Sequence, residues 1–496
     1  MTRTTATLSK RQLTWLLGGL MLAMLLAALD QTIVGTALPT IVGELGGMGH
    51  YSWVVTAYLL ASTASTPLYG KLSDLYGRRP VLLFAIVTFL LGSLAAGLSQ
   101  NMTQLIIFRG VQGLGAGGLM TLAFTIISDV VPPRERGRYQ GFFGAVFGVA
   151  SVAGPLVGGY FAERDWRWIF YVNLPIGIAA LVLCNQVLRL VHTPRREHSI
   201  DWLGAAAMVA GVSCLLLALS WGGSEYAWNS PMIIGLLVAG VVLSLTFLWI
   251  ESRAAEPILP LRLFRNRTFS LANGAGFVVG FGMFGGIIYI PLYLQIVKGA
   301  SPTESGLLML PMMAGIIVTS IVAGQLTARW GRYKWFPVFD IAILSLGLLL
   351  FSYLPVQSAL WVSFIYMVIV GVGLGMSMQT LILGLQNSLE PTDMGAGTST
   401  ATFFRSMGGS FGVAVLGTVL NNRLNSHLTV RVPEALAQLP PGQAQQYAGQ
   451  LAGGQVSIAA PAVIAQLPAP LRAAIEASLV AALHPVFLIA ASVCAI

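Results

Sequence analysis

Residues 70–79 read GKLSDLYGRR, and residues 324–333 read GQLTARWGRY. Gly, Leu, Gly and Arg recur at matching places, and a Ser–Thr pair and a Tyr–Trp pair are chemically similar. The same offset of 254 residues, with no gap, aligns further glycines: Gly117 with Gly371, Gly141 with Gly395, Gly154 with Gly408, and Gly158 with Gly412. A single offset kept over this length indicates that the chain contains two duplicated halves in parallel orientation.

The composition places both halves in a membrane. Apolar residues make up 56% of the 496 residues and charged residues only 9%, with a mean hydropathy of +0.78, whereas soluble domains carry about 25% charged residues. A hydrocarbon core about 30 Å thick requires about 20 apolar residues per helix. Fourteen segments meet this requirement, near residues 13–37, 51–70, 80–99, 103–128, 137–161, 167–190, 201–221, 231–252, 269–295, 304–328, 336–354, 358–386, 395–420 and 474–496. We therefore expect an all-α integral membrane protein with fourteen transmembrane helices.

The repeat and the apolar segments together define the expected organisation. Residues 1–190 form the first six-helix half, residues 191–265 carry two inserted transmembrane helices with their linkers, and residues 266–496 form the second six-helix half. Within the second half, residues 421–473 contain no apolar run of spanning length, and we expect a long extracytoplasmic loop there. The chain stops at Ile496 without the basic flank that usually follows a final helix, which suggests an incomplete chain.

The basic residues indicate how the chain is oriented. Most of the 27 Lys and Arg residues lie in alternate connections, on the side that also carries Arg3 and Lys10. Because cytoplasmic loops are enriched in Lys and Arg, we expect both termini in the cytoplasm. The net charge of +9 then follows from topology, which indicates a lipid bilayer rather than nucleic acid as the partner. The three cysteines lie in apolar runs and have neither disulfide-framework nor metal-ligand spacing, so no metal site is expected.

An acid interrupts the first apolar segment. Residues 25–39 read LLAALDQTIVGTALP, and a carboxylate such as Asp30 at the centre of a membrane helix costs about 2.5–3.5 kcal/mol on insertion scales. At 1.5 Å per residue, Asp30 and Arg109 lie about 13 Å and about 9 Å below the same end of their helices, so the two side chains could meet directly or through water. The repeat offset aligns them with Phe284 and Ser363, so the second half lacks both charges.

Buried acids in membranes commonly mark ion or proton pathways. We therefore predict that Asp30 is the proton-coupling carboxylate and that Arg109 tunes its affinity for the proton. The acid is then retained because it has to change charge during the working cycle. A purely structural buried ion pair is the alternative interpretation.

The loop at 70–79 contains residues suited to a tight turn and to ion pairs. Gly70 and Gly77 permit a tight reversal of the chain, and Asp74 can face the positive end of a helix dipole. Arg78 can reach an acid, for which Asp129 at the cytoplasmic end of the fourth apolar segment is the candidate. The second copy of the loop has Ala328 where the first has Asp74, so only the first copy can make these contacts. A solvated, positively charged loop is the alternative.

Parallel halves are one transporter architecture, in which the cargo site lies near the membrane midplane between the halves. The surface that would contact such a cargo is the least distinctive part of the sequence. Flexible Met and aromatic side chains suit varied lipophilic molecules. The candidates lie in the second, ninth, tenth and thirteenth apolar segments: Trp53, Tyr58, Phe281, Phe284, Tyr289, Met309, Met312 and Arg405. Arg405 could hydrogen-bond helix ends or an anionic cargo, and ordinary helix packing is the alternative for the others.

Five stretches resemble motifs of one known family. They are LDQTIVGTALP (29–39), GKLSDLYGRRP (70–80), LIIFRGVQGLGAG (105–117), GVASVAGPLVGGY (148–160) and RSMGGSFGVA (405–414). In combination they are similar to the major facilitator superfamily, in its fourteen-helix drug:proton antiporter (multidrug efflux) branch. The resemblance covers nearly the whole chain. It departs from the pattern at Gly35, where the branch often has Asn, and in the length of segment 421–473.

The resemblance implies a proton-coupled antiporter that exports lipophilic, cationic drugs across the bacterial cytoplasmic (inner) membrane by alternating access. It implies that the loop latches the outward-facing state, and that Gly148, Gly154, Pro155 and Gly158 form a helix motif associated with antiport. These glycines also offer close-packing surfaces, and Pro155 bends its helix. The energy source would be the proton gradient with no cofactor, and a monomer is expected.

Three other classes of function are an exporter of envelope components, a membrane enzyme or ATP-driven pump, and a channel. The same fold could export a lipid or other cell-envelope component, with residues 421–473 receiving the cargo outside the membrane. A membrane enzyme or an ATP-driven pump is not indicated, because the sequence contains no GxxxxGK[ST] motif and suggests neither a metal-ligand cluster nor a Ser–His–Asp arrangement. A channel is disfavoured, because parallel halves and a gate-like loop favour alternating access.

Overall fold

The computed structural model describes residues 9–45, 51–189, 201–223, 225–330, 335–452, 464 and 466–495, and its regular elements are helical. Before residue 190 lie α1 (Lys10–Leu45), α2 (Tyr51–Tyr76), α3 (Arg78–Gly97), α4 (Met102–Val130), α5 (Pro133–Ala162), α6 (Trp168–Tyr171) and α7 (Asn173–Leu188). The inserted pair is α8 (Trp202–Trp221) and α9 (Pro231–Glu251), followed by the 3-10 helix η2 (Leu261–Arg265). The remaining helices are α10 (Arg267–Ile296), α11 (Pro302–Leu308), α12 (Leu310–Trp330), α13 (Phe336–Phe351), α14 (Leu360–Asn387), the 3-10 helix η3 (Pro391–Asp393), α15 (Met394–Leu436), α16 (Pro441–Ala452) and α18 (Ala469–Ala495).

Twelve helical stretches among the described residues are long and apolar enough to cross a membrane. Helices α6 and α7 together form one of them, and α11 and α12 together form another. Two predicted spans do not meet these limits. Helix α13 has only 16 residues, and α2 is 26 residues long but carries Ser, Thr and Pro67 in its middle. The predicted multi-pass helical bundle is confirmed, whereas the number fourteen stays a prediction.

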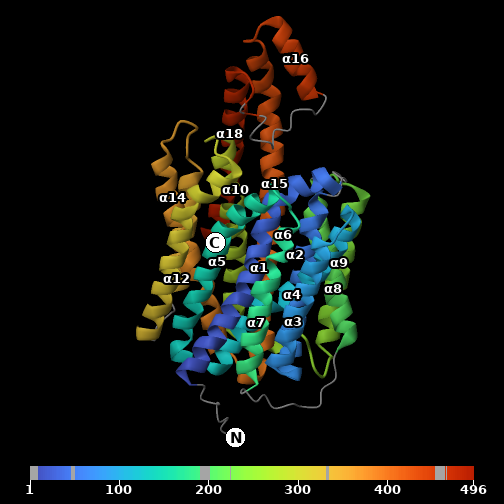
Figure 1. The fold of residues 1–496 in the computed structure, drawn as a ribbon, viewed down its shortest axis with the longest axis vertical. Helices are drawn as coiled ribbons and strands as arrows, with labels where there is room; N and C mark the ends of the chain where they lie inside the picture. The colour runs from blue at the N-terminus through green and yellow to red at the C-terminus, as the bar shows by residue number, and fades with distance from the viewer. Residues whose placement is uncertain are drawn as a thin grey trace.

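The long helices run side by side, with α8 and α9 at one edge of the bundle and α12 and α14 at the other (Figure 1). Helix α1 begins at one end of the bundle, and α15, α16 and α18 project beyond the opposite end. We call these ends the N-terminal face and the extension face. One large hydrophobic cluster is built mainly from α1, α3, α4 and α7, and another from α10, α12, α14 and α18. The predicted boundaries of the two halves are not tested by these clusters.

Helices α5 and α12 bring the two clusters together along their length. A Cβ added at Gly137 would lie 3.1 Å from the Gly324 oxygen, and one added at Gly141 would lie 2.8 Å from the Ser320 oxygen. The backbones therefore approach closely because glycine has no side chain at these points.

The second copy of the repeated loop is described only up to Trp330, so its residues 331–333 lie outside the described residues.

The inserted helices pack on each other and on α2. Gly240 of α9 approaches Leu215 of α8, since a Cβ there would lie 2.7 Å from the Leu215 side chain. Thr56 of α2 and Ser220 of α8 share a hydrogen bond of 2.8 Å. The Trp53 ring meets the Trp221 ring edge-on, with 4.9 Å between centroids. The insertion is thus fastened to the bundle at the extension-face end of α2.

Segment 421–473, where a long loop is expected, is largely helical where the structure describes it. Helix α15 continues to Leu436, α16 follows, and α18 begins at Ala469. Leu424, Leu428, Val432 and Ala435 recur every three or four residues and pack into the same cluster as α18. Such an amphipathic stripe forms a helix that buries one face only. A search for continuous apolar runs therefore passes over it.

Candidate functional site

Asp30 and Arg109 form a direct ion pair inside the bundle. Arg109 Nη1 donates to Asp30 Oδ2 at 2.5 Å, and the two residues are 1% and 0% exposed. The other carboxylate oxygen, Asp30 Oδ1, accepts hydrogen bonds from Gln112 Nε2 at 2.8 Å and from Asn173 Nδ2 at 3.4 Å. Helices α1, α4 and α7 therefore supply the acid, its countercharge and its neutral donors. The predicted meeting of the two charged groups is confirmed; its role is not tested by geometry.

Arg109 has partners beyond the carboxylate. Its Nη1 also donates to Gln112 Oε1 at 2.8 Å, and its Nε donates to the Val54 oxygen at 3.3 Å. The guanidinium lies 4.2 Å above the Tyr58 ring centroid, a favourable cation–π arrangement. Tyr58 was predicted to contact cargo; the structure places it under the buried ion pair instead, with its hydroxyl donating to the Ala27 oxygen.

Further polar groups surround the ion pair. Asn173 begins α7, and its amide also donates to Ser93 Oγ at 3.0 Å, while the Ser93 hydroxyl donates to the Phe170 oxygen. A buried ion pair is tolerated when its remaining lone pairs and protons are satisfied. With Asp30 ionised the pair carries no net charge. A proton on Asp30 would leave the Arg109 charge uncompensated in apolar surroundings.

The predicted antiport motif on α5 packs directly against the next turn of α1. The Thr32 hydroxyl donates to the Ala150 oxygen at 3.0 Å, and a Cβ at Gly154 would overlap the Thr32 side chain. A Cβ at Gly158 would lie 2.8 Å from the Ile33 oxygen. Two of the motif glycines therefore allow α5 to touch α1 within three residues of Asp30.

The opposite side of α5 contacts the second half. A Cβ at Gly148 would lie 2.8 Å from the Ile317 side chain of α12. Pro155 lies against Gly306 of α11, where an added Cβ would approach it to 3.1 Å. Helix α5 is thus in contact with the Asp30 helix on one side and with α11 and α12 on the other.

Arg78 is the centre of the predicted latch at the N-terminal face. Its Nη1 lies 2.6 Å from Asp74 Oδ1 and donates to Ser73 Oγ at 2.6 Å, while its Nε donates to Asp129 Oδ2 at 2.7 Å. Gly77 precedes α3 with a φ of 93°, a conformation that glycine adopts without steric cost. The predicted Arg78–Asp129 contact is confirmed, and Asp74 joins it.

Asp74 carries the latch across to the second half. Its Oδ1 accepts the Gly395 N–H at 3.0 Å and its Oδ2 accepts the Ala396 N–H at 2.8 Å, at the start of α15. A carboxylate is stabilised there by free N–H groups and by the helix dipole. Gly70 lets α2 approach, because a Cβ at Gly70 would overlap Ser399. All predicted latch residues therefore meet at one place.

Two glutamines strengthen this contact between the halves. Gln140 of α5 donates to Gln386 Oε1 of α14 at 2.8 Å, and Gln386 in turn donates to the Phe124 oxygen at 3.3 Å. Sequence reasoning did not select them. The available signal was their occurrence as uncharged polar residues near the same end of two otherwise apolar helices.

The opposite end of α1 is also fixed. Arg167 Nη1 donates to Glu44 Oε1 at 2.6 Å, and the Trp166 indole N–H donates to Glu44 Oε2 at 2.8 Å. These hydrogen bonds from Arg167 and Trp166 lower the pKa of the Glu44 carboxyl from its ordinary value. Helix α1, which carries Asp30, is therefore held near its extension-face end.

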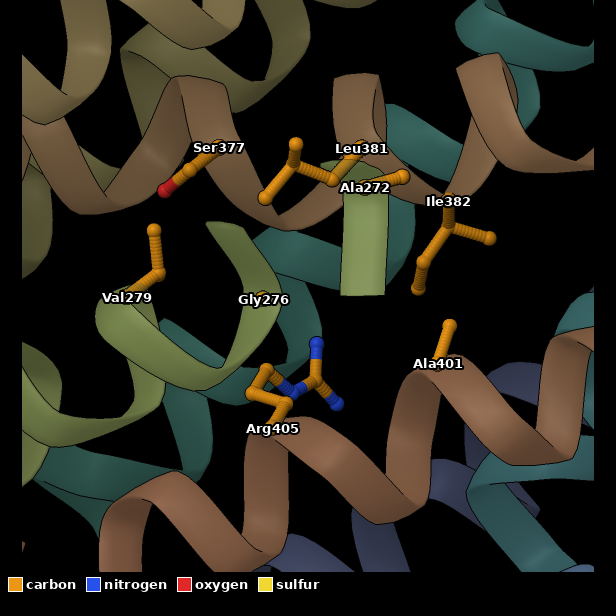
Figure 2. Close-up of a pocket in the computed structure, with 8 residues that line it drawn as sticks. All are labelled: Ala272, Gly276, Val279, Ser377, Leu381, Ile382, Ala401 and Arg405. Carbon is orange, nitrogen blue, oxygen red and sulfur yellow. The ribbon is translucent and has the colours of Figure 1, made fainter. Parts of the chain in front are cut away.

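The residues predicted to contact cargo do not form one surface. Phe281, Tyr289, Met309 and Met312 are buried in the second hydrophobic cluster, against which Phe284 packs. Of the eight, Arg405 lines a small pocket. Figure 2 shows its side chain extending from α15 toward α10 and α14. The pocket lining is completed by residues of these three helices: Ala272, Gly276, Val279, Ser377, Leu381, Ile382 and Ala401.

The family profile of the Major Facilitator Superfamily matches residues 20–413 of the chain. The chain belongs to the major facilitator superfamily. Multidrug transporter protein MdtP of Bacillus subtilis (strain 168) is 42% identical to it over 492 residues, covering 97% of this chain and 90% of that protein. Multidrug resistance protein 3 of the same strain is 39% identical over 414 residues, covering 83% and 80%. The crystal structure of the human organic anion transporter MFSD10 (TETRAN) has a TM-score of 0.61 at 14% identity, covering 97% and 99% of the two chains, and shares the fold.

As a member of the superfamily, the chain is a multi-pass membrane transporter and not an enzyme. Its relatives from Bacillus fit a bacterial cytoplasmic membrane. Within this family frame, sequence reasoning missed two ligands of Asp30. Gln112 lies three residues after Arg109 on α4 and hence on the same helix face, which is a usable signal. Asn173 could be recognised only as a polar residue within an apolar segment.

Proposed function

We propose that this superfamily member exports lipophilic small molecules in exchange for protons by alternating access. The observation that carries the proposal is the buried Asp30–Arg109 pair, with hydrogen-bond partners on both charged groups. Relatives named as a multidrug transporter and a multidrug resistance protein support the cargo class. Protons and lipophilic molecules are the proposed partners, and the proton gradient is the energy source without a cofactor.

Coupling would follow from the charge of the pair. The ionised pair is neutral and suits a dry, closed environment. A proton on Asp30 leaves Arg109 with a net positive charge that apolar surroundings disfavour, which favours a conformation in which water reaches the site. Thr32 is bonded to α5, and α5 packs on α12. A change in packing around Asp30 would therefore act through Thr32 and α5 on the interface between the halves.

The latch would control access from one side. We place the N-terminal face in the cytoplasm, with both termini, because most Lys and Arg residues lie on that side. The Asp74 contacts with Gly395 and Ala396 then close the cytoplasmic side, as expected of an outward-facing state. Release of these two hydrogen bonds would admit cargo from the cytoplasm.

The remaining features of the proposal concern organisation and cargo. Helices α2 and α13 would complete fourteen spans in a monomer with halves 1–190 and 266–496, in a bacterial cytoplasmic membrane. A positively charged group on the cargo is part of this proposal. Export of a lipid or other envelope component is not favoured, because the relatives described above are named for drugs.

Transport by purified protein in proteoliposomes tests the proposal. The probe is the lipophilic cation rhodamine 123, added under an imposed pH gradient with a pH-sensitive dye in the lumen. We expect accumulation of rhodamine 123 against its own gradient, and faster collapse of the pH gradient when the probe is present. A protonophore should abolish both. Uphill accumulation that persists with the protonophore, or cargo equilibration without accumulation, would exclude proton-driven antiport.

A further inference from the structure

Arg405 has a charge for which the structure provides no partner. It is 9% exposed and sits on α15, and no described residue accepts a hydrogen bond from its guanidinium or forms an ion pair with it. The other deeply buried arginines behave differently. Arg78 is paired with two acids, Arg109 with Asp30, and Arg136 donates to the Ser128 oxygen at 2.6 Å. Arg405 is thus the exception among the described buried arginines.

The backbone of Arg405 is held in place while its side chain faces the pocket. A Cβ at Gly280 would overlap the Arg405 backbone oxygen, so α10 and α15 pack closely there. The guanidinium extends into the space between α10, α14 and α15 (Figure 2). The pocket is lined otherwise by apolar residues and Ser377, whose hydroxyl is directed to the oxygens of Gly373 and Leu374 at 3.2 Å. The chemical character of the site is therefore one cation in an apolar enclosure.

A buried cation without a countercharge is costly, and in membrane proteins such residues mark substrate or ion pathways. Guanidinium groups bind carboxylates and related oxyanions through two parallel, charge-assisted hydrogen bonds. We propose that this pocket binds the carboxylate, or a comparable oxyanion, of an amphiphilic cargo whose apolar body lies along α10 and α14. The cargo is then a zwitterionic lipophile, which carries this carboxylate together with the positive charge proposed above.

The proposal rests on the proposed function only in taking a lipophilic small molecule as cargo. The Asp30–Arg109 pair is neutral by itself, and an anionic group at Arg405 would neutralise the remaining buried cation. The closed state with cargo bound would then carry no uncompensated charge at either site. A purely cationic cargo would instead add a second positive charge near Arg405.

A matched pair of dyes tests the pocket without any gradient. Rhodamine 110 carries a free carboxylate, and rhodamine 123 is its methyl ester with the same fluorophore. Equilibrium binding to the full chain in lipid nanodiscs should show at least about tenfold tighter binding of the acid. Arg405→Gln should remove this preference by weakening the acid alone, and Arg405→Lys should retain part of it. Arg423→Gln, an exposed position on the same helix, is the control and should match the wild type.

A second variant keeps the test decisive if Arg405→Gln does not fold. Gly276 lines the pocket, and a Cβ added there would have one neighbour within 4 Å, the Ala401 oxygen at 3.9 Å. Gly276→Leu should therefore fill the pocket and leave the Arg405 charge unchanged. It should weaken both dyes at least about tenfold, while Gly274→Leu, where nothing lies within 4 Å, should not. The proposal is overturned if the wild type binds the two dyes equally or binds neither of them. It is also overturned if Gly276→Leu binds both dyes as tightly as the wild type. Loss of proton-driven transport with the binding preference intact would refute the proposed antiport but not this site.

Discussion

Replacing Asp74 by Asn should open the N-terminal face, and the structure allows the size of the effect to be worked out. The carboxylate accepts the N–H groups of Gly395 and Ala396 with separate oxygens and also contacts Arg78. An amide retains one acceptor oxygen, while its NH₂ group would face the second N–H as a donor. The variant therefore loses one hydrogen bond between the halves and the charge that strengthens the other.

The expected magnitude follows from typical hydrogen-bond energies. A buried donor left without a partner costs about 1–3 kcal/mol, and a bond to a neutral acceptor is about 1 kcal/mol weaker than one to a charged acceptor. A net loss of about 2–4 kcal/mol would shift the ratio of open to closed N-terminal faces by about 30- to 900-fold. Arg78 keeps Asp129 as a partner, so the fold itself should be little affected.

Pulsed EPR distances between spin labels provide the assay. One label replaces Tyr76, which is 51% exposed, and the other replaces the exposed Thr392 before α15, with the native cysteines changed to alanine. We expect a longer-distance population in Asp74→Asn that is absent from the parent. Asp165→Asn serves as control, because Asp165 is exposed and its carboxylate contacts the nearby Arg167. An unchanged distance distribution in a folded, monodisperse Asp74→Asn protein would refute the latch.

Three further predictions concern other parts of the bundle. Arg109→Ala removes the countercharge of a buried carboxylate, which typically costs about 3–5 kcal/mol. The unfolding temperature in detergent should fall markedly, and proton-driven transport should disappear. An unchanged unfolding temperature would argue against a tight pair. Gly154→Val should collide with Thr32 and destabilise the protein by about 1–3 kcal/mol, whereas Gly35→Val, with nothing within 4 Å, should leave the unfolding temperature near the parent value. A cysteine at the exposed Gln445 should react with a membrane-impermeant maleimide from outside only, and labelling solely from the cytoplasmic side would reverse the proposed topology.

The features that sequence alone could predict depend on periodic or repeated patterns. The helical bundle follows from long apolar runs, and the latch follows from a loop in which Asp74, Gly77 and Arg78 keep a fixed spacing. The meeting of Asp30 and Arg109 was predicted from their similar depths in two helices. In each case a one-dimensional property, such as length or depth, determines the three-dimensional outcome.

The features that sequence reasoning missed depend on contacts between distant helices. Asn173 and Gln112 become ligands of Asp30 only because α1, α4 and α7 converge at one depth. Tyr58 was predicted to contact cargo because it is aromatic, yet its ring lies beneath the Arg109 guanidinium. The helical continuation through Val432 depends on packing against α18, which a search for apolar runs does not detect.

The most direct test of the account is uphill transport by Asp30→Asn compared with Asp340→Asn. Both acids are 0% exposed in apolar helices, but among the described residues only Asp30 has a basic partner. In proteoliposomes with an imposed pH gradient, Asp30→Asn should fail to accumulate rhodamine 123 yet still exchange it across the membrane without a gradient. Asp340→Asn should accumulate it at close to the wild-type rate. Accumulation by Asp30→Asn at the wild-type rate would contradict the assignment of proton coupling to Asp30.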